Sequence, residues 1–142
     1  MPVSALEVKK AIVIELRKNT ALMTALKDTS ATWENGNIYL DHVSDLPQAY
    51  RVFPSISITK ISDKNDHTWT GKEIILQIDV WTKNGNAKAQ EILDQVDLTL
   101  NLKQISYNNI NIALIVQTDG LDAYQNINYT SHCLNRYKIK VT

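Results

Sequence analysis

Two stretches of the chain place hydrophobic residues at the spacing of an α-helix. In the first, Ser4 and Glu7 have the spacing of a capping box, which marks a helix start. Apolar residues then recur every three or four positions as far as Leu16, and charged residues occupy the opposite side. The pattern returns over residues 87–102, and a shorter helix is predicted over residues 20–27. The apolar stripe of the 87–102 helix consists of Ala89, Ile92, Leu93, Val96 and Leu100.

Apolar and polar residues alternate before and after the second long helix, which is typical of half-buried strands. The polar residues 62–71 are predicted to form the tip of a long hairpin. Asp119 and Gly120 have the composition of a turn and predict a second hairpin. The strands of these hairpins are predicted over residues 55–59, 73–81, 110–117 and 127–141. The apolar face of the third strand is predicted to contain Ile110, Ile112, Leu114 and Val116.

Together these elements predict an α+β fold of one domain, residues 1–142. The two hairpins form a four-stranded antiparallel sheet, and two amphipathic helices pack on its apolar face to complete a two-layer sandwich. A short strand over residues 38–40 is predicted in the connection before the first hairpin. A chain of this length buries enough surface for an ordinary core, so the fold needs no disulfide or metal.

Four large apolar side chains fall outside the predicted core. Ile14 and Leu98 lie among charged residues on the polar faces of the two long helices. Trp69 is in the polar hairpin tip, and Trp81 is at the end of a strand. One exposed leucine needs no explanation, but several exposed anchors that include tryptophans are typical of protein–protein interfaces. We therefore predict protein contacts at these residues, the alternative being that a monomer tolerates them on its surface.

No motif in the sequence points to catalysis. The four glycines are isolated and each fits a turn, so they form no phosphate-binding loop. His132 and Cys133 are adjacent on a strand, so their side chains point to opposite faces and do not form a catalytic pair. Residues 41–45 and 63–67 combine aspartates with a histidine, but they are predicted to be solvated loops rather than metal sites. The sequence thus predicts no catalytic residue, no metal, no cofactor and no enzyme.

The charges of the chain cancel, with 15 basic and 15 acidic residues. A nucleic-acid-binding protein usually carries a basic excess, so no specific nucleic-acid binding is predicted. The last strand has a basic stripe, which we interpret as a solvated face that pairs with acids such as Glu73 and Asp79 on a neighbouring strand. This stripe consists of Arg136, Lys138 and Lys140.

Three features of the sequence bear on the cellular compartment: its longest apolar run, its first residues and its cysteine content. Its longest apolar run, residues 112–116, is much shorter than the roughly 20 residues that span a bilayer, so no membrane association is predicted. The first residues have no pattern of a secretory signal. The single cysteine, Cys133, allows no internal disulfide, which agrees with assembly in a reducing cytoplasm.

Four features then follow one another in a characteristic order. They are an N-terminal helix with Leu6, Ile12 and Leu16, a proline-flanked strand over residues 52–58, a long strand over residues 73–81 that ends in an aromatic residue, and, after the 87–102 helix, a closing strand over residues 132–141. In this layout nearly the whole chain resembles the tail-completion proteins of siphophages, also called tail terminators or tail-to-head joining proteins.

The resemblance implies a structural role in the virion. Such proteins form a ring, typically of six subunits, at the head-proximal end of the tail tube, where they end tube polymerisation and join the tail to the head. The implied partners are other copies of the chain, the tail tube protein and the head connector or stopper protein, which assemble in the host cytoplasm. In such a ring, the helix faces that carry Ile14 and Leu98 are predicted to contact neighbouring copies. The 62–71 tip, with His67 and Trp69, is predicted to contact a partner above or below the ring along its axis.

Two alternatives remain open at the level of sequence. One is another neck protein, such as a head-completion or stopper ring. The other is a small ferredoxin-like ligand-binding domain or enzyme, which would need a pocket lined by converging polar groups.

Overall fold

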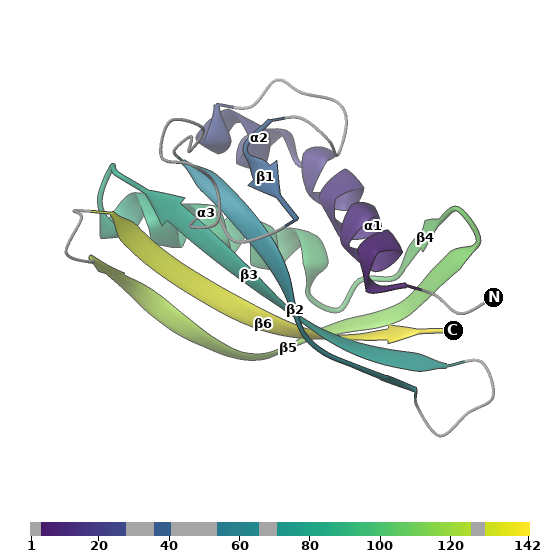
Figure 1. The fold of residues 1–142 in the computed structure, drawn as a ribbon. Helices are drawn as coiled ribbons and strands as arrows, with labels where there is room; N and C mark the ends of the chain where they lie inside the picture. Colours follow the sequence, from purple (N-terminus) through teal and green to yellow (C-terminus); the bar gives the residue numbers. More distant parts are fainter. Residues whose placement is uncertain (1–3, 28–35, 41–53, 66–70, 126–129) are drawn as a thin grey trace.

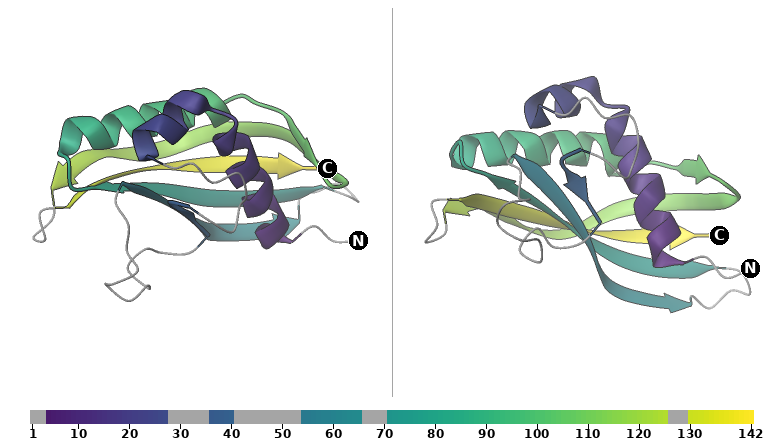
Figure 2. Two further views of the ribbon diagram at one scale, coloured as in Figure 1. Left: turned by 90° about the horizontal axis from the view of Figure 1, so that it is seen from above. Right: turned by 45° about the horizontal axis from the view of Figure 1, so that its top comes forward.

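A computed structural model of the chain describes residues 4–27, 36–40, 54–65, 71–125 and 130–142. In these residues three helices lie on the concave face of a sheet that curls into a half-barrel (Figures 1 and 2). The helices are α1 (Ala5–Arg17), α2 (Thr20–Leu26) and α3 (Asn86–Leu100). The strands are β1 (Ile38–Tyr39), β2 (Ser55–Asn65), β3 (Lys72–Thr82), β4 (Ile105–Tyr107), β5 (Ile110–Gln125) and β6 (Ser131–Val141).

The sheet is mixed and has the strand order β1-β2-β3-β6-β5-β4 in the described residues. Its four long strands are antiparallel neighbours and correspond to the two predicted hairpins. At one edge β1 pairs in parallel with β2, and at the other edge β4 pairs antiparallel with β5. The prediction of a four-stranded antiparallel sheet with two helices is therefore wrong, because the described sheet has six strands of mixed direction and three helices on it.

β1, with two residues, confirms the short strand predicted over residues 38–40, but the sequence analysis did not assign that strand to the sheet. β4 was not predicted, and its three residues are too few to show alternation. Asn108 and Asn109, between β4 and β5, have φ values of 42° and 64°. Asparagine tolerates this left-handed conformation, and two such residues in succession form a typical hairpin turn. The short helix α2 is predicted from the sequence as an element, but not as part of the helical layer that covers the sheet. Its N-terminus is capped by Asn19, whose Oδ1 accepts a hydrogen bond from the Leu22 N–H.

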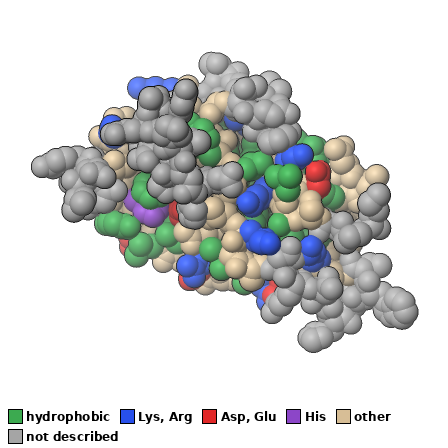
Figure 3. All heavy atoms as spheres, in the orientation of Figure 1, with side chains coloured by type: hydrophobic (Ala, Val, Ile, Leu, Met, Phe, Trp, Pro, Cys, Tyr) green, Lys and Arg blue, Asp and Glu red, His purple; other side chains and the backbone are tan. Residues whose placement is uncertain are grey.

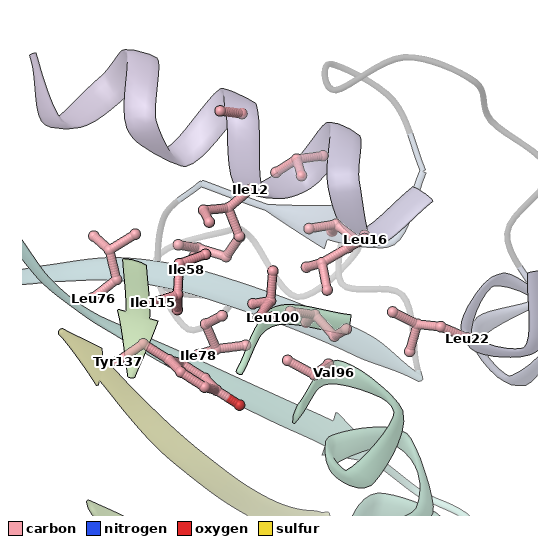
Figure 4. Packing of buried hydrophobic residues seen from close by; sticks show 14 of the residues in the cluster. Ile12, Leu16, Leu22, Ile58, Leu76, Ile78, Val96, Leu100, Ile115 and Tyr137 are labelled. Atoms are coloured by element: carbon pink, nitrogen blue, oxygen red, sulfur yellow. The ribbon is translucent and has the colours of Figure 1, made fainter. Parts of the chain in front are cut away.

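The two long helices form where the spacing of apolar residues predicts them. The Ser4 side chain accepts a hydrogen bond from the Glu7 N–H (3.2 Å) and caps α1. In α3 all five residues of the predicted stripe are buried, which confirms the face that meets the sheet. Figure 4 shows how the core is filled from both layers, with Ile12 and Leu16 of α1, Val96 and Leu100 of α3, and Ile58, Leu76, Ile78, Ile115 and Tyr137 of the sheet.

β5 departs most from its predicted course. The strand continues through Asp119 and Gly120 to Gln125, so the predicted turn at these two residues is wrong. The register between β5 and β6 shifts three times, and the first shift places Ile115 in the core and leaves Leu114 41% exposed. The Asp-Gly pair lies at the second irregularity. A Cβ atom on Gly120 would collide with the Asn135 side chain, so the glycine allows the two strands to approach.

Candidate interaction surface

The structure describes three of the five predicted contact residues. Leu98 is 68% exposed and lies on the side of α3 opposite the buried stripe. Ile14 on α1 and Trp81 at the end of β3 are half-buried. His67 and Trp69 lie outside the described residues. Of these three residues, Leu98 is therefore the most exposed candidate for a contact with another protein.

The two flanks of α3 are occupied by contacts within the chain. On the flank toward α2, the Asn19 side-chain amide donates a hydrogen bond to the Thr99 hydroxyl (2.8 Å). On the flank toward β5, the Gln90 side-chain oxygen accepts a hydrogen bond from the Ala123 N–H (3.4 Å). What remains exposed is an outer ridge that combines acidic residues with a leucine. The ridge consists of Glu91, Asp94 and Leu98.

A chain of hydrogen bonds links the core to the β5 flank of α3. The buried Tyr137 hydroxyl donates to Asp97 Oδ1 (3.0 Å) and accepts from Asn135 Nδ2 (3.1 Å). Asn135 Oδ1 in turn accepts from Gln117 Nε2 (3.0 Å). Burial raises the pKa of Tyr137 well above its ordinary value, which is itself above neutral pH, and the hydroxyl is therefore a donor. The carboxylate of Asp97 is thus held in a fixed orientation at the surface.

Beside this chain lies a hollow of about 250 Å³ between α3 and the β5–β6 pair. Asp94, Asp97 and Asp122 contribute three carboxylates to its lining, and the other lining residues are uncharged. The excess of negative charge makes this flank attractive to a basic side chain of another protein.

A second polar cluster, which the sequence analysis did not predict, surrounds His132 on the other face of the sheet. The Trp81 ring stacks on His132 with 3.7 Å between ring centroids, and its Nε1 donates to Ser57 Oγ (3.3 Å). Asp79 Oδ1 lies 3.4 Å from His132 Nε2, and the Tyr124 hydroxyl lies 3.0 Å from Nδ1. Trp81 therefore already packs on a side chain of its own chain.

The cluster is brought together by the pairing of β3 with β6. Trp81 and His132 face each other across β3 and β6, and Asp79 is two residues away on the same face. The alternation in each strand predicts which residues share a face. The register between the strands, which brings these three residues together, is set by tertiary structure.

Cys133 lies on the opposite face from His132, as predicted. Its thiol is buried and donates to the Ala89 carbonyl oxygen (3.4 Å). Burial is the main cause that raises the pKa of Cys133 to about 12, and nearby aspartates raise it further. The thiol is therefore protonated at neutral pH, and its role is in packing.

The basic stripe on β6 is paired with neighbouring side chains. Lys138 forms an ion pair with Glu73 (3.4 Å), which confirms one predicted partner. Arg136 lies 3.7 Å from the carboxylate of Asp119, and its Nε donates to Gln77 Oε1 (3.0 Å). The other predicted partner, Asp79, is buried and pairs with His132 instead.

We predict that the isolated protein shows no measurable DNA binding at physiological salt. Part of the charge of the stripe is neutralised by Glu73 and Asp119, and the whole chain has no net charge. Phosphate contacts dominate DNA affinity, and each neutralised phosphate contributes a slope of about −0.9 to its salt dependence. A gel shift that weakens with salt and is abolished in the double variant Lys138→Glu/Lys140→Glu would contradict this prediction.

Within the described residues, no group of three or more histidine, cysteine, aspartate or glutamate side chains is arranged to hold a metal ion. Most of the aspartates and histidines that the sequence places in two loops lie outside these residues. None of the described helices combines the length and the apolar composition of a membrane-spanning segment.

An α3–β5 side with exposed anchors and fixed charges is typical of a protein that assembles with others. Residues 10–141 match the model of the family described as "Tail completion protein gp17". Since the match covers most of the chain, the chain belongs to this family and is a structural protein of a phage tail, a component of the virion.

The fold agrees with this membership. A chain in the structure described as "Virion of native gene transfer agent (GTA) particle" superimposes with a TM-score of 0.71 over 98% of each chain, at 18% sequence identity. At this identity the comparison shows a shared fold. No curated protein matches the sequence.

Proposed function

We propose that this protein forms a ring of six copies at the head-proximal end of a siphophage tail tube. There it ends tube polymerisation and joins the tail to the head connector or stopper protein. The observation that carries the proposal is the family match over residues 10–141. The similarity of fold to a chain of a phage-like particle supports it.

The described surface is consistent with a subunit that binds copies of itself. A ring is built from heterologous contacts, in which each copy offers two different surfaces. Leu98 on α3 and Ile14 on α1 are the anchors we assign to these contacts, because they lie on different helices. The segment 62–71, with His67 and Trp69, remains our proposed contact with the tube or the connector.

The proposal is tested by removing the protein during infection. A phage with a stop codon in this gene should produce tails of irregular length, together with filled heads that carry no tail. Supplying the protein from a plasmid should restore uniform, joined tails. Tails of normal length that fail only to join heads would contradict tube termination and would favour a stopper ring.

A binding experiment separates these two neck functions in vitro. Purified protein should bind the end of isolated tail tubes before any head connector is added. Binding to connectors alone, with no binding to tubes, would contradict the assignment as a terminator.

A further inference from the structure

The charges that cancel over the whole chain are separated in space. α3 and β5 lie at the far side of the molecule in Figure 1, and the start of α1, β1 and β2 lie at the near side (Figures 1 and 2). α3 and β5 together contain five acidic residues and one basic residue, Lys88. We call this the acidic side. Its carboxylates belong to Glu91, Asp94, Asp97, Asp119 and Asp122. Glu91 forms an ion pair with Lys88 (3.8 Å), and Asp119 pairs with Arg136 on the other face of the sheet (3.7 Å), which leaves Asp94, Asp97 and Asp122 around the hollow.

The elements of the near side have the opposite net charge, because α1, β1 and β2 together contain five basic and three acidic residues. Figure 3 shows lysine and arginine side chains gathered on it. Lys60 on β2 is exposed and shares the helix-covered face of the sheet with its pairing partner Leu76. On α1, Lys9 donates to the Leu40 carbonyl oxygen (3.1 Å), which places it near β1, and Lys10 forms an ion pair with Glu7 of the same helix (3.3 Å). We call this the basic side, and its lysines are Lys9, Lys10 and Lys60.

Each side also exposes large apolar residues beside its charges. Leu98 (68%) and Leu121 (48%) are exposed on the acidic side. Leu6 (49%) and Ile61 (46%) are exposed on the basic side. Apolar anchors surrounded by charges are the usual composition of an interface in which burial provides affinity and charge sets register.

The acidic side is suited to side-chain contacts rather than to the addition of a strand. Several outer backbone groups of β5 are engaged by α3 and the residues after it, and the start of the strand pairs with β4. The Leu102 N–H donates to the Ile115 carbonyl oxygen (2.7 Å), and the Ala123 N–H donates to Gln90. An incoming subunit therefore meets the ridge of α3 and the carboxylates around the hollow, not an open strand edge.

We infer that the acidic side of one copy binds the basic side of the next copy. The inference rests on the proposed ring and names its subunit contact. Two copies joined acidic side to acidic side would bring carboxylates together, and two joined basic side to basic side would bring lysines together. Only the mixed contact brings opposite charges together, and because the two sides lie at opposite margins of the sheet it repeats from copy to copy and can close into a ring.

The inference is tested with two charge-reversal variants. The first, Asp94→Lys/Asp122→Lys, changes exposed residues of the acidic side, and the second, Lys10→Glu/Lys60→Glu, changes the basic side. Each variant alone should self-associate at least about tenfold more weakly than the parent, because the mixed contact then joins like charges. Association of the parent should weaken as salt is raised, since exposed charges are screened. Light scattering over a concentration series measures both effects.

Mixing the two variants provides the decisive observation. The reversed acidic side of the first fits the reversed basic side of the second, and their unchanged sides also fit each other. An equimolar mixture should therefore regain the association of the parent, as an alternating assembly. The control is Lys138→Glu/Lys140→Glu, which changes the net charge as much as the second variant but lies on the other face of the sheet. It should associate like the parent.

Three results would overturn the inference. They are a parent that stays monomeric at millimolar concentration and low salt, single variants that associate like the parent, and a mixture that associates no better than its components. Each of them leaves the tail-length test of the proposed function unaffected. Normal tail lengths without the protein would instead contradict the function and leave a measured subunit contact in place.

Discussion

Replacing Leu93 with alanine is expected to lower the free energy of unfolding by about 2–5 kcal/mol. Leu93 is 2% exposed and belongs to the stripe by which α3 packs on the sheet. The truncation removes buried methyl groups and leaves a cavity that a two-layer core refills only in part. Chemical denaturation followed by circular dichroism measures the change.

Leu98 provides the matched control in the same helix. Because Leu98 is 68% exposed, Leu98→Ala should change the unfolding free energy of the monomer by less than about 0.5 kcal/mol. A loss below about 0.5 kcal/mol for Leu93→Ala as well would show that this face of α3 is not the core face.

Replacing Leu98 or Ile14 with aspartate is expected to leave the monomer folded and to weaken self-association by about ten- to a hundredfold. Leu98 is exposed and Ile14 is half-buried, so a carboxylate at either position remains in contact with water in the monomer. In a subunit contact the same carboxylate would lose its hydration and replace an apolar anchor. Sedimentation velocity measures association, and thermal unfolding shows that the monomers are intact.

Leu114→Asp makes the same chemical change at a leucine that is 41% exposed on β5. Leu114 points away from the core face and pairs in register with Lys140, so we expect its association to match the parent. Unchanged association in both the Leu98 and the Ile14 variants, at parental stability, would refute the assignment of these anchors.

The helices were predictable from the sequence because a helix is specified locally. The apolar stripe of α3 and the Ser4 cap of α1 depend on residues within a few positions of one another, and both are present as predicted. The edge strand β4 was not predictable in the same way. β4 exists because the Asn108-Asn109 turn returns the chain alongside β5, and three residues are too few for a periodic signal.

The course of β5 was mispredicted for a different reason. An Asp-Gly pair favours a tight turn in an isolated hairpin, but here the strand passes through Asp119 and Gly120 as an irregularity. Alternation counts residues two by two, so one register shift moves every later side chain to the other face. This is why Ile115 rather than Leu114 is in the core.

The candidate surface combines local and non-local information. The exposure of Leu98 follows from its place on the helix opposite the buried stripe, and the sequence predicts it. The hollow beside Asp97 and the separation of acidic from basic residues arise only when α3 is placed over β5. Charge counted along the chain was balanced, and the fold distributes it between opposite sides.

The position of the protein in the assembled particle tests the central claim most directly. Cryo-electron microscopy of the neck of a phage that carries this gene should show a ring of six copies between the last ring of the tail tube and the head connector. Neighbouring copies in that ring should meet through α3 of one and the α1–β2 side of the next. Density for this chain at the tail tip, inside the head or along the tube would contradict the account.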